Sequence, residues 1–392
     1  MGDKMDTALF ASMLSDKDAY DLKKLGYKYP KAGIADYVAL LKKGIYRDIP
    51  LHDFDGNGLV YMSTVKPPVT AAVKRLMKNR DAGGTFGINA MEKEIAGTFT
   101  IESIDFTRES VRKIMRGYAP ADESENRIFG MKKGLEFIAD KQTAITEDTI
   151  HTLYRTAIGE YLDEDDRLQP GRLYRHGEVF VVGEAVEHSG LPYEKLPAYM
   201  AALVDYINTE DDTDELLKGA VIHFYLSYLH PYFDGNGRMA RLLQLWYFVR
   251  RGFPGSMFVP FSGFVERSRK QYYNAFTLIE QNKKISDVLD VTPFLDYFTR
   301  YVYNKIPAEA PGTPAAEDYE NALKNGSVTQ KETELWRFVL SFYGTGEFST
   351  KQLEKEFQNA AYATIRGFVL KFEKLGLLHA QKYGSRVKYS VK

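Results

Sequence analysis

The sequence contains no cysteine among its 392 residues. That absence excludes disulfide bridges, zinc–thiolate sites, iron–sulfur clusters and thiol nucleophiles. Long apolar runs are absent too: no stretch approaches the roughly 18–20 residues of a membrane span, and charges are scattered through residues 1–22. We therefore expect no membrane partner, and the cytoplasm is the default location.

The net charge is close to zero, because 52 lysines and arginines nearly balance 53 aspartates and glutamates. The distribution is nevertheless uneven. Residues 321–392 carry 12 basic and six acidic side chains, whereas the first 320 residues sum to −7. A basic tail on an acidic body predicts a separate role for the tail.

The length of the chain predicts two or three domains. Three prolines and a glycine between residues 307 and 316 indicate an extended linker. We expect residues 1–90 to form a region without an assigned role, 91–306 a core, 307–320 a linker and 321–392 a tail module. Apolar periodicity predicts helices at 34–43, 69–79, 109–116, 125–141, 147–158, 194–208, 214–229, 237–250, 266–281 and 291–304. The fold class is therefore expected to be mainly α.

The tail shows three helical patterns, at 331–342, 350–357 and 361–375, followed by two short strands around residues 383–385. Three helices followed by a hairpin resemble a winged helix-turn-helix module. Two interpretations stay open: contact with DNA, which the basic charge favours, or a protein-docking or dimerisation module.

A glycine-containing segment, HPYFDGNGRMAR from His230 to Arg241, separates the helices expected at 214–229 and 237–250. Backbone amides of such a loop can turn toward an anion, and the helix that starts there adds unpaired N–H groups. The loop residues are Gly235, Asn236 and Gly237. The pattern predicts an anion site at the start of the second helix.

Four side chains around this loop suit phosphate chemistry. Arg238 and Arg241 are three positions apart, so both project from one side of the first helical turn and suit a di- or triphosphate. Asp234 could hold a Mg²⁺ ion that bridges phosphate oxygens, and His230 can take up a proton near neutral pH. Together they indicate phosphoryl or nucleotidyl transfer.

The same segment resembles the Fic family motif HPFx(D/E)GNGRxxR at every fixed position except one, where Tyr232 replaces the usual phenylalanine. The resemblance spans roughly residues 90–305. It implies a Fic helical bundle and a protein adenylyltransferase, which moves AMP from ATP to a Ser, Thr or Tyr hydroxyl of a protein target.

Carried onto matching positions, the resemblance implies that His230 deprotonates the incoming hydroxyl, which attacks the α-phosphate of ATP as pyrophosphate leaves. Asp234 would hold Mg²⁺. Phosphate would be bound by Gly235, Asn236, Gly237, Arg238 and Arg241, with Asn236 donating a side-chain hydrogen bond and the two arginines neutralising the leaving β- and γ-phosphates.

Two further elements follow from the resemblance. The stretch Tyr272, Tyr273 and Asn274 resembles the one beside which adenine stacks, although an aromatic pair on a helix is also typical of a core. A hairpin predicted from Arg172 to Val182, with its turn at His176–Gly177, sits where the family has a flap that pins the target's main chain as an added strand. Its flap residues would be Val179, Phe180 and Val181; the alternative is a simple edge ribbon.

Residues 98–103, TFTIES, resemble the family's inhibitory motif (S/T)xxxE(G/N), with Ser103 in place of glycine or asparagine. The resemblance implies that a helix carrying Thr98 and Glu102 directs the Glu102 carboxylate at Arg241 and keeps the enzyme inhibited. The alternative is an ordinary surface carboxylate. In some relatives the same glutamate positions a water that removes AMP, so a bifunctional enzyme stays open.

The pentapeptide FDGNG occurs twice, at 233–237 and at 54–58. The copy at 54–58 cannot form the same phosphate site, because Leu59 stands at the position of the first arginine. An EF-hand starting at Asp53 also fails, since Thr64 occupies the position of the bidentate glutamate. We expect a tight turn at 55–58.

Other functions remain open at this point. A regulator that senses nucleotide and binds DNA through residues 321–392 is the main alternative to an enzyme. Among enzymes, relatives use other donors, such as phosphocholine nucleotides, or act as kinases. Self-modification and a homodimer are further partner hypotheses.

Overall fold

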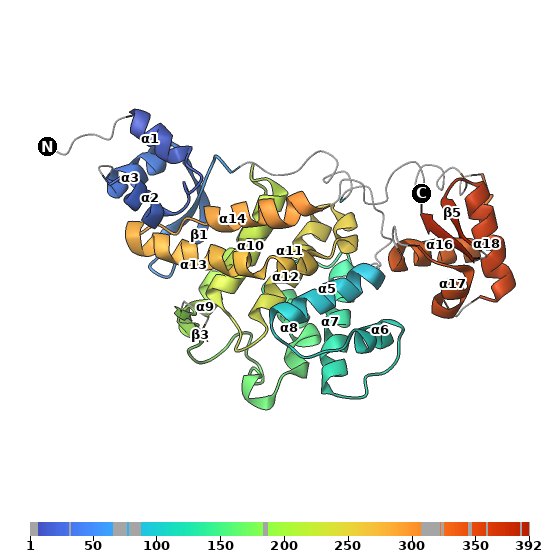
Figure 1. Cartoon of the computed structure of the whole chain (residues 1–392). Helices are drawn as coiled ribbons and strands as arrows, with labels where there is room; N and C mark the ends of the chain where they lie inside the picture. Colours follow the sequence, from blue (N-terminus) through green and yellow to red (C-terminus); the bar gives the residue numbers. More distant parts are fainter. Residues whose placement is uncertain are drawn as a thin grey trace.

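The computed structural model describes residues 7–30, 33–65, 77, 88–182, 187–306, 322, 325–343, 347–357, 360–384 and 386–391. The described chain is mainly helical, as the sequence predicts (Figure 1). The expected linker at 307–320 and, apart from Met77, the expected helix at 69–79 lie outside the described residues.

The helices are α1 (Thr7–Leu14), α2 (Leu22–Lys28), α3 (Ile34–Gly44), α5 (Ile88–Ile101), α6 (Arg108–Met115), α7 (Glu123–Ala139), α8 (Glu147–Ala157), α9 (Leu196–Asn208), α10 (Glu215–Leu229), α11 (Asn236–Arg250), α12 (Phe261–Arg267), α13 (Arg269–Ser286), α14 (Thr292–Tyr297), α16 (Gln330–Phe342), α17 (Thr350–Phe357) and α18 (Tyr362–Lys374). Three antiparallel pairs accompany them: β1 (Tyr46–His52) with β2 (Gly58–Met62), β3 (Phe180–Val182) with β4 (Glu187–Ser189), and β5 (Leu378–Tyr383) with β6 (Arg386–Val391).

One predicted helix is divided in the structure. The pattern at 266–281 predicts a single helix, but α12 ends at Arg267 and α13 begins at Arg269. Between them, Ser268 leaves helical geometry at φ −121° and ψ 29°. Its buried hydroxyl bonds to the Phe264 carbonyl and to the Tyr297 hydroxyl, which fixes the break.

The centre of the molecule is the antiparallel pair α10 and α11 (Figure 1). Both helices are buried on nearly every face, which explains why they lack a polar stripe. Trp246 on α11 and Tyr225 on α10 are fully buried there. A rigid pair of core helices therefore holds the loop of residues 230–235 that joins them.

Helix α5 packs closely against α12. Gly97 makes this approach possible, because a Cβ there would lie 2.7 Å from the backbone of Ser262 and Gly263. Beside it, the buried Glu94 carboxylate accepts hydrogen bonds from the Ser262 N–H (2.9 Å) and hydroxyl. These contacts fix α5 on the body of the protein.

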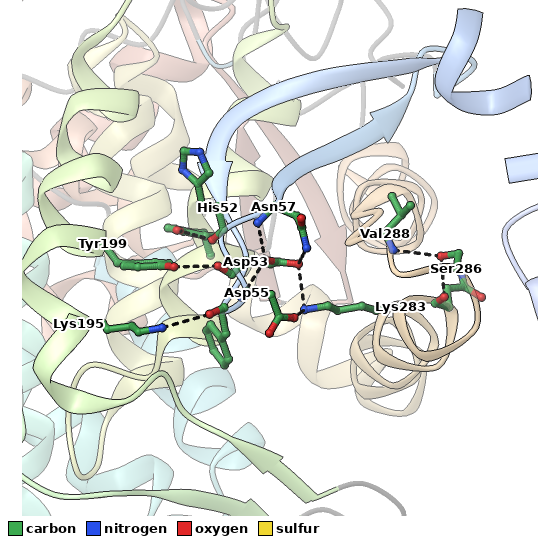
Figure 2. A network of polar contacts seen from close by, with 12 residues as sticks. His52, Asp53, Asp55, Asn57, Lys195, Tyr199, Lys283, Ser286 and Val288 are labelled. Atoms are coloured by element: carbon green, nitrogen blue, oxygen red, sulfur yellow. Dashed lines mark hydrogen bonds and ion pairs between the residues drawn. The ribbon is translucent and has the colours of Figure 1, made fainter. Parts of the chain in front are cut away.

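The described parts of residues 7–65, a region for which the sequence indicated no function, dock on α13 and on residues 289–292. The buried Asn282 side chain accepts from the Leu22 N–H and donates to the Tyr20 carbonyl. The turn predicted at 55–58 is present at the tip of the β1–β2 hairpin, where Asp53 accepts from the N–H groups of Asp55 and Asn57 (Figure 2).

The tail consists of α16–α18 and the β5–β6 hairpin, close to the predicted boundaries. It has a hydrophobic core of its own around Leu335, Phe368 and Phe372. α16 contacts α5, and Arg116 pairs with Glu356 between the body and the tail.

Among the described residues, none of the helices combines the length and apolar character needed to cross a bilayer.

Candidate active site

The loop between α10 and α11 begins and ends with a residue whose backbone is left-handed. His230 ends α10 at φ 54° and ψ 60°, and Gly235 precedes α11 at φ 83°. A side chain at φ > 0 costs energy, whereas glycine adopts this region readily. The reversals turn the chain back on itself, so that His230 and the first turn of α11 belong to one site.

Asn236 holds this loop closed from inside. Its side-chain carbonyl accepts from the Tyr232 N–H (2.9 Å), and its amide donates to the Tyr232 carbonyl (2.8 Å). The buried Tyr232 ring stacks on Tyr154, with centroids 3.6 Å apart, and the Tyr154 hydroxyl donates to the Asp234 carbonyl. One donation of the Asn236 amide is thus used within the loop, and its bond with phosphate stays a prediction.

Arg238 and Arg241 are both buried, and each is paired with a carboxylate. Arg238 donates to Asp234 at 2.6 Å, and Arg241 donates to Glu102 at 2.5 Å. Yet Nε of Arg238 and Nη1 of Arg241 have no hydrogen-bond acceptor among the described residues. Buried donors without acceptors are costly, so this site has an unmet demand for anionic oxygens.

Arg241 is held at two points by the segment that includes α5. Its Nε donates to the Thr98 hydroxyl at 2.8 Å, and its Nη2 reaches Glu102, directly after the end of α5. Burial acts to lower the pKa of Arg241, but the Glu102 carboxylate outweighs it and raises the pKa. The predicted contact of Glu102 with Arg241 is therefore present in the structure.

Glu102 lies over the first turn of α11, since a Cβ built on Gly237 would collide with its carboxylate. Ser103 follows at φ 57°, the left-handed region that favours glycine or asparagine. Arg269 donates to the Ser103 hydroxyl at 3.1 Å and supports the turn. The carboxylate thus occupies the entrance to the anion site predicted there.

The three adenine-side candidates differ in position. Tyr272 is 3% exposed, and its hydroxyl bonds to His223 at 2.9 Å, so its ring belongs to the core in this conformation. Tyr273 is 44% exposed beside the end of α5, where its hydroxyl contacts the Ile101 carbonyl at 3.5 Å. Asn274 is exposed. Only Tyr273 and Asn274 present a surface that a base could reach.

The β3–β4 hairpin lies further along the chain than the sequence suggested. Its strands are 180–182 and 187–189, so the predicted turn at His176–Gly177 is wrong and precedes the hairpin. Phe180 is 69% exposed, Val179 is partly buried, and Val181 pairs with His188 through the backbone. Apolar residues occur on both sides of Gly177, which is also typical of two strands joined by a turn, and this explains why the turn was predicted too early in the chain.

Residues 144–248 match the family model described as the Fic/DOC family. This segment is a Fic domain. The chain is 28% identical over 255 residues to "Protein adenylyltransferase Fic" of Nematostella vectensis, which covers 63% of this chain and 53% of that protein. It is 26% identical over 219 residues to "Protein adenylyltransferase fic-1" of Caenorhabditis elegans, covering 54% and 38%. The chain thus spans about half or less of these curated relatives.

A Fic family protein of Desulfovibrio desulfuricans G20 is a structural neighbour, with 20% identity and a TM-score of 0.49 over 83% of this chain and 98% of that chain. The Fic domain of the present chain includes the whole segment from His230 to Arg241. Glu102 and Tyr272 lie outside the matched residues and join the site only through tertiary packing.

Arg175 is a residue of the Fic domain that sequence analysis missed. It is 2% exposed, and its guanidinium donates to the carbonyls of His230 (2.7 Å), Gly177 (2.6 Å) and Leu191. Its own N–H donates to the Pro231 carbonyl. One side chain thus ties both ends of the β3–β4 segment to the histidine, and no local sequence pattern reveals it.

Proposed function

We propose that this chain is a protein adenylyltransferase that transfers AMP from ATP to a Ser, Thr or Tyr hydroxyl of a protein. The observation that carries the proposal is the pair of buried arginines with unsatisfied N–H groups near the start of α11, where Nη1 of Arg241 lies 3.3 Å from a Cβ built on Gly237. Two guanidinium groups beside a helix N-terminus suit the phosphate chain of a nucleoside triphosphate. The printed names of the curated relatives support the same reaction.

His230 would act as the general base. Its Nδ1 lies 3.4 Å from the Ser227 carbonyl, and a hydrogen on Nδ1 makes Nε2 the basic nitrogen. Nε2 would take the proton of the target hydroxyl as that oxygen bonds to the α-phosphorus. The bond from this phosphorus to the bridging oxygen then breaks, and pyrophosphate carries away the electron pair.

Arg238 and Arg241 would stabilise the charge that develops on the pyrophosphate. Both lie within the first two turns of α11 and are buried, so a charge–charge interaction there is screened less than in water. Because each arginine is paired with a carboxylate in this structure, phosphate oxygens would have to replace Asp234 and Glu102 as acceptors.

Asp234 is the residue that would hold Mg²⁺. Its side chain is 49% exposed at the edge of the phosphate site, which suits an ion that binds one carboxylate and takes its remaining ligands from phosphate and water. The described residues contain no cluster of three ligands, in keeping with a metal that arrives with the nucleotide. When bound, the ion neutralises phosphate charge.

Glu102 and Thr98 would form an inhibitory device. Their bonds to Arg241 remove two of its donors from the nucleotide, and the carboxylate lies over Gly237. The β3–β4 hairpin would serve as the flap that aligns the target's main chain. The tail would be a winged helix-turn-helix module that contacts another macromolecule.

Replacing Glu102 by glycine tests the reaction and the inhibition together. We expect the intact mass of purified Glu102→Gly protein, or of proteins mixed with it, to increase by one AMP after incubation with ATP and Mg²⁺, at least about tenfold faster than for the unaltered chain. Glu109→Gly, an exposed glutamate of α6, is the matched control and should leave the rate unchanged. An added phosphate in place of AMP would overturn the proposed reaction, and an unchanged rate would overturn the inhibitory role.

His230→Ala in the Glu102→Gly background tests the base. Transfer should fall by about a hundredfold or more, because general-base catalysis contributes that much. ATP affinity, measured by calorimetry, should change little, since the arginines are untouched. Retained transfer would reject His230 as the base.

A further inference from the structure

A pocket of about 380 Å³ lies next to the β3–β4 hairpin and to α10, the helix that ends at His230. Ser189 of β4 and Tyr228, two residues before His230, both line it. The adjoining Gly190 is so close to the histidine that a Cβ there would lie 3.3 Å from the His230 Cβ. A peptide aligned on the hairpin would therefore pass next to this pocket.

The tip of the β1–β2 hairpin forms another wall and is held rigidly (Figure 2). The Asp53 carboxylate is fully buried and accepts from Lys283 at 2.9 Å, while the Tyr199 hydroxyl donates to the Asp53 carbonyl. Burial opposes ionisation of Asp53, but the Lys283 ammonium and the Asn57 N–H outweigh it and lower its pKa. The wall is thus preformed around an ionised carboxylate.

The inner surface of the pocket is apolar. Phe54 of the hairpin tip stacks on Tyr228, with ring centroids 4.1 Å apart, and Leu289 completes the lining. The pentapeptide at 54–58, which lacks the arginines of a phosphate site, thus supplies Phe54 to the wall of this pocket. An aliphatic stem could lie against these side chains.

The rim is charged: two carboxylates and two ammonium groups line it, and one of these ammonium groups, that of Lys283, is paired with carboxylates that do not line the pocket. Glu280, Lys284 and Asp287 line it, and Asp287 has no ion-pair partner among the described residues. Lys283 is shared between Asp53 and Asp55. Among the described residues that line the pocket, Lys284 is then the other ammonium group beside the carboxylates of Glu280 and Asp287.

The C-terminal end of α13 adds negative potential at the same place. This helix has 18 residues and ends at Ser286, and Asp287 caps it. Helix C-termini carry roughly half a negative charge and favour cations. An apolar pocket with a negative rim matches a long side chain with a positive end.

We propose that this pocket binds a lysine or arginine side chain of the protein target, within a few residues of the hydroxyl that receives AMP. The assignment of the occupant to a target rests on the proposed function. The stem packs on Phe54 and Tyr228, and the cationic head lies at Asp287 and Glu280. The β1–β2 hairpin thereby takes part in choosing the substrate.

Binding of short synthetic peptides tests the pocket without requiring catalysis. Each fluorescent peptide has a central tyrosine and alanines elsewhere, with arginine or the uncharged norleucine placed at one flanking position at a time. On the full-length Glu102→Gly, His230→Ala chain, arginine should bind about fivefold more tightly than norleucine at one or two positions only. Equal binding at every position, or the same gain wherever arginine is placed, would overturn the proposal.

Charge variants locate the effect. Asp287→Asn should remove the preference for arginine, and Asp287→Lys should transfer it to peptides with glutamate at the same position. Asp212→Asn, an exposed aspartate between α9 and α10, is the control and should retain the preference. A preference that survives Asp287→Asn would contradict the assignment.

The two proposals fail separately. Mass analysis of the Glu102→Gly chain reports whether AMP is transferred at all, whereas peptide affinity reports the pocket. Transfer without a position-specific preference for arginine would overturn only the pocket. Such a preference without transfer would keep the pocket as a peptide site and reject the reaction.

Discussion

Arg175 fixes the backbone around His230 although no carboxylate neutralises it in the described residues. Its guanidinium is satisfied by three carbonyl groups, and burial lowers the pKa of this arginine. A planar fork of donors is what such an arrangement needs, and a lysine ammonium cannot reproduce it. Arg175 is thus a positioning residue, which acts through the His230 backbone.

Replacing Arg175 by lysine should reduce AMP transfer by about tenfold or more in the Glu102→Gly background, since small displacements of catalytic groups have large effects. ATP affinity should stay within about twofold, because the hydrogen bonds of Arg175 go to backbone carbonyls and not to Arg238 or Arg241. Steady-state kinetics and calorimetry measure the two quantities. The control Arg172→Lys, an exposed arginine of the same segment, should leave both unchanged. Equal loss of ATP affinity and transfer would point to general unfolding.

His223 is a buried neutral histidine behind the site. Its Nδ1 donates to the Gln244 side-chain carbonyl (2.7 Å), given that the Gln244 amide donates to Tyr303. Its Nε2 then accepts from Tyr272, which fixes that ring. Burial lowers the pKa of His223 to about 3.

The protein should lose stability in acid through this residue. Because the folded-state pKa is below the unfolded value of about 6.5, the unfolded chain binds the extra proton between pH 6.5 and 3. Urea unfolding of wild type and His223→Gln should therefore converge as the pH falls, by up to about 1.4 kcal/mol per pH unit. His379→Gln, an exposed control, should give a difference independent of pH. A constant difference for His223→Gln would contradict a neutral buried imidazole.

At the residue scale, the sequence could predict candidate site residues that lie close together in one short segment. His230, Asp234 and the two arginines are contiguous, so their spacing could be read along one loop and one helical turn. Arg175, His223 and the pocket at Phe54 could not be predicted, because their partners come from distant segments. Tyr272, one of the adenine-side candidates, packs in the core, which is the alternative that the sequence left open.

Among the elements, α5 is the one that carries the proposed inhibitory device. Its tight contact with α12 at Gly97 determines where Thr98 and Glu102 stand relative to Arg241. The sequence predicted the inhibitory contact through resemblance, yet no apolar periodicity marked α5 itself, because the helix is buried on most sides. Amphipathic helices such as α6 and α8 were predicted within one or two residues.

Gly97→Ala should displace α5 from α12. A methyl group there meets backbone atoms, which cannot move aside as a flexible side chain can. We expect a loss of about 1–3 kcal/mol of stability, typical of overpacking, together with faster AMP transfer as Glu102 leaves Arg241. Thermal melts and labelled-ATP transfer measure the two effects.

The matched control is Gly367→Ala, in α18, where a Cβ meets nothing within 4 Å. It should stabilise by roughly 0.5–1 kcal/mol and leave transfer unchanged. Destabilisation by Gly97→Ala without any gain in transfer would separate the packing of α5 from inhibition.

On the scale of the whole molecule, the body and the tail have separate hydrophobic cores. They meet where α16 contacts α5 and at the Arg116–Glu356 pair, and partly exposed ion pairs contribute about 1 kcal/mol or less. The composition of residues 307–320, which lie outside the described chain, predicted a linker, whereas nothing in the sequence predicted the contact between α16 and α5.

A chain that ends at residue 324 should keep a folded body. Its melting temperature should fall by only a few degrees, because few contacts are lost. A fragment of residues 325–391 should unfold cooperatively by itself. Circular dichroism checks both, with Glu356→Gln in the full chain as the control for the ion pair. An aggregated body would show that its core requires the tail.

The left-handed backbone at His230 has a consequence for evolution in the laboratory. Glycine at this position would relieve about 1 kcal/mol of strain. Selection for thermal stability alone should therefore enrich His230→Gly, a variant that lacks the proposed general base and should not transfer AMP. A mutant library of this protein therefore needs a screen for AMP transfer at every round, because at position 230 the residue that favours stability is not the residue that the reaction needs.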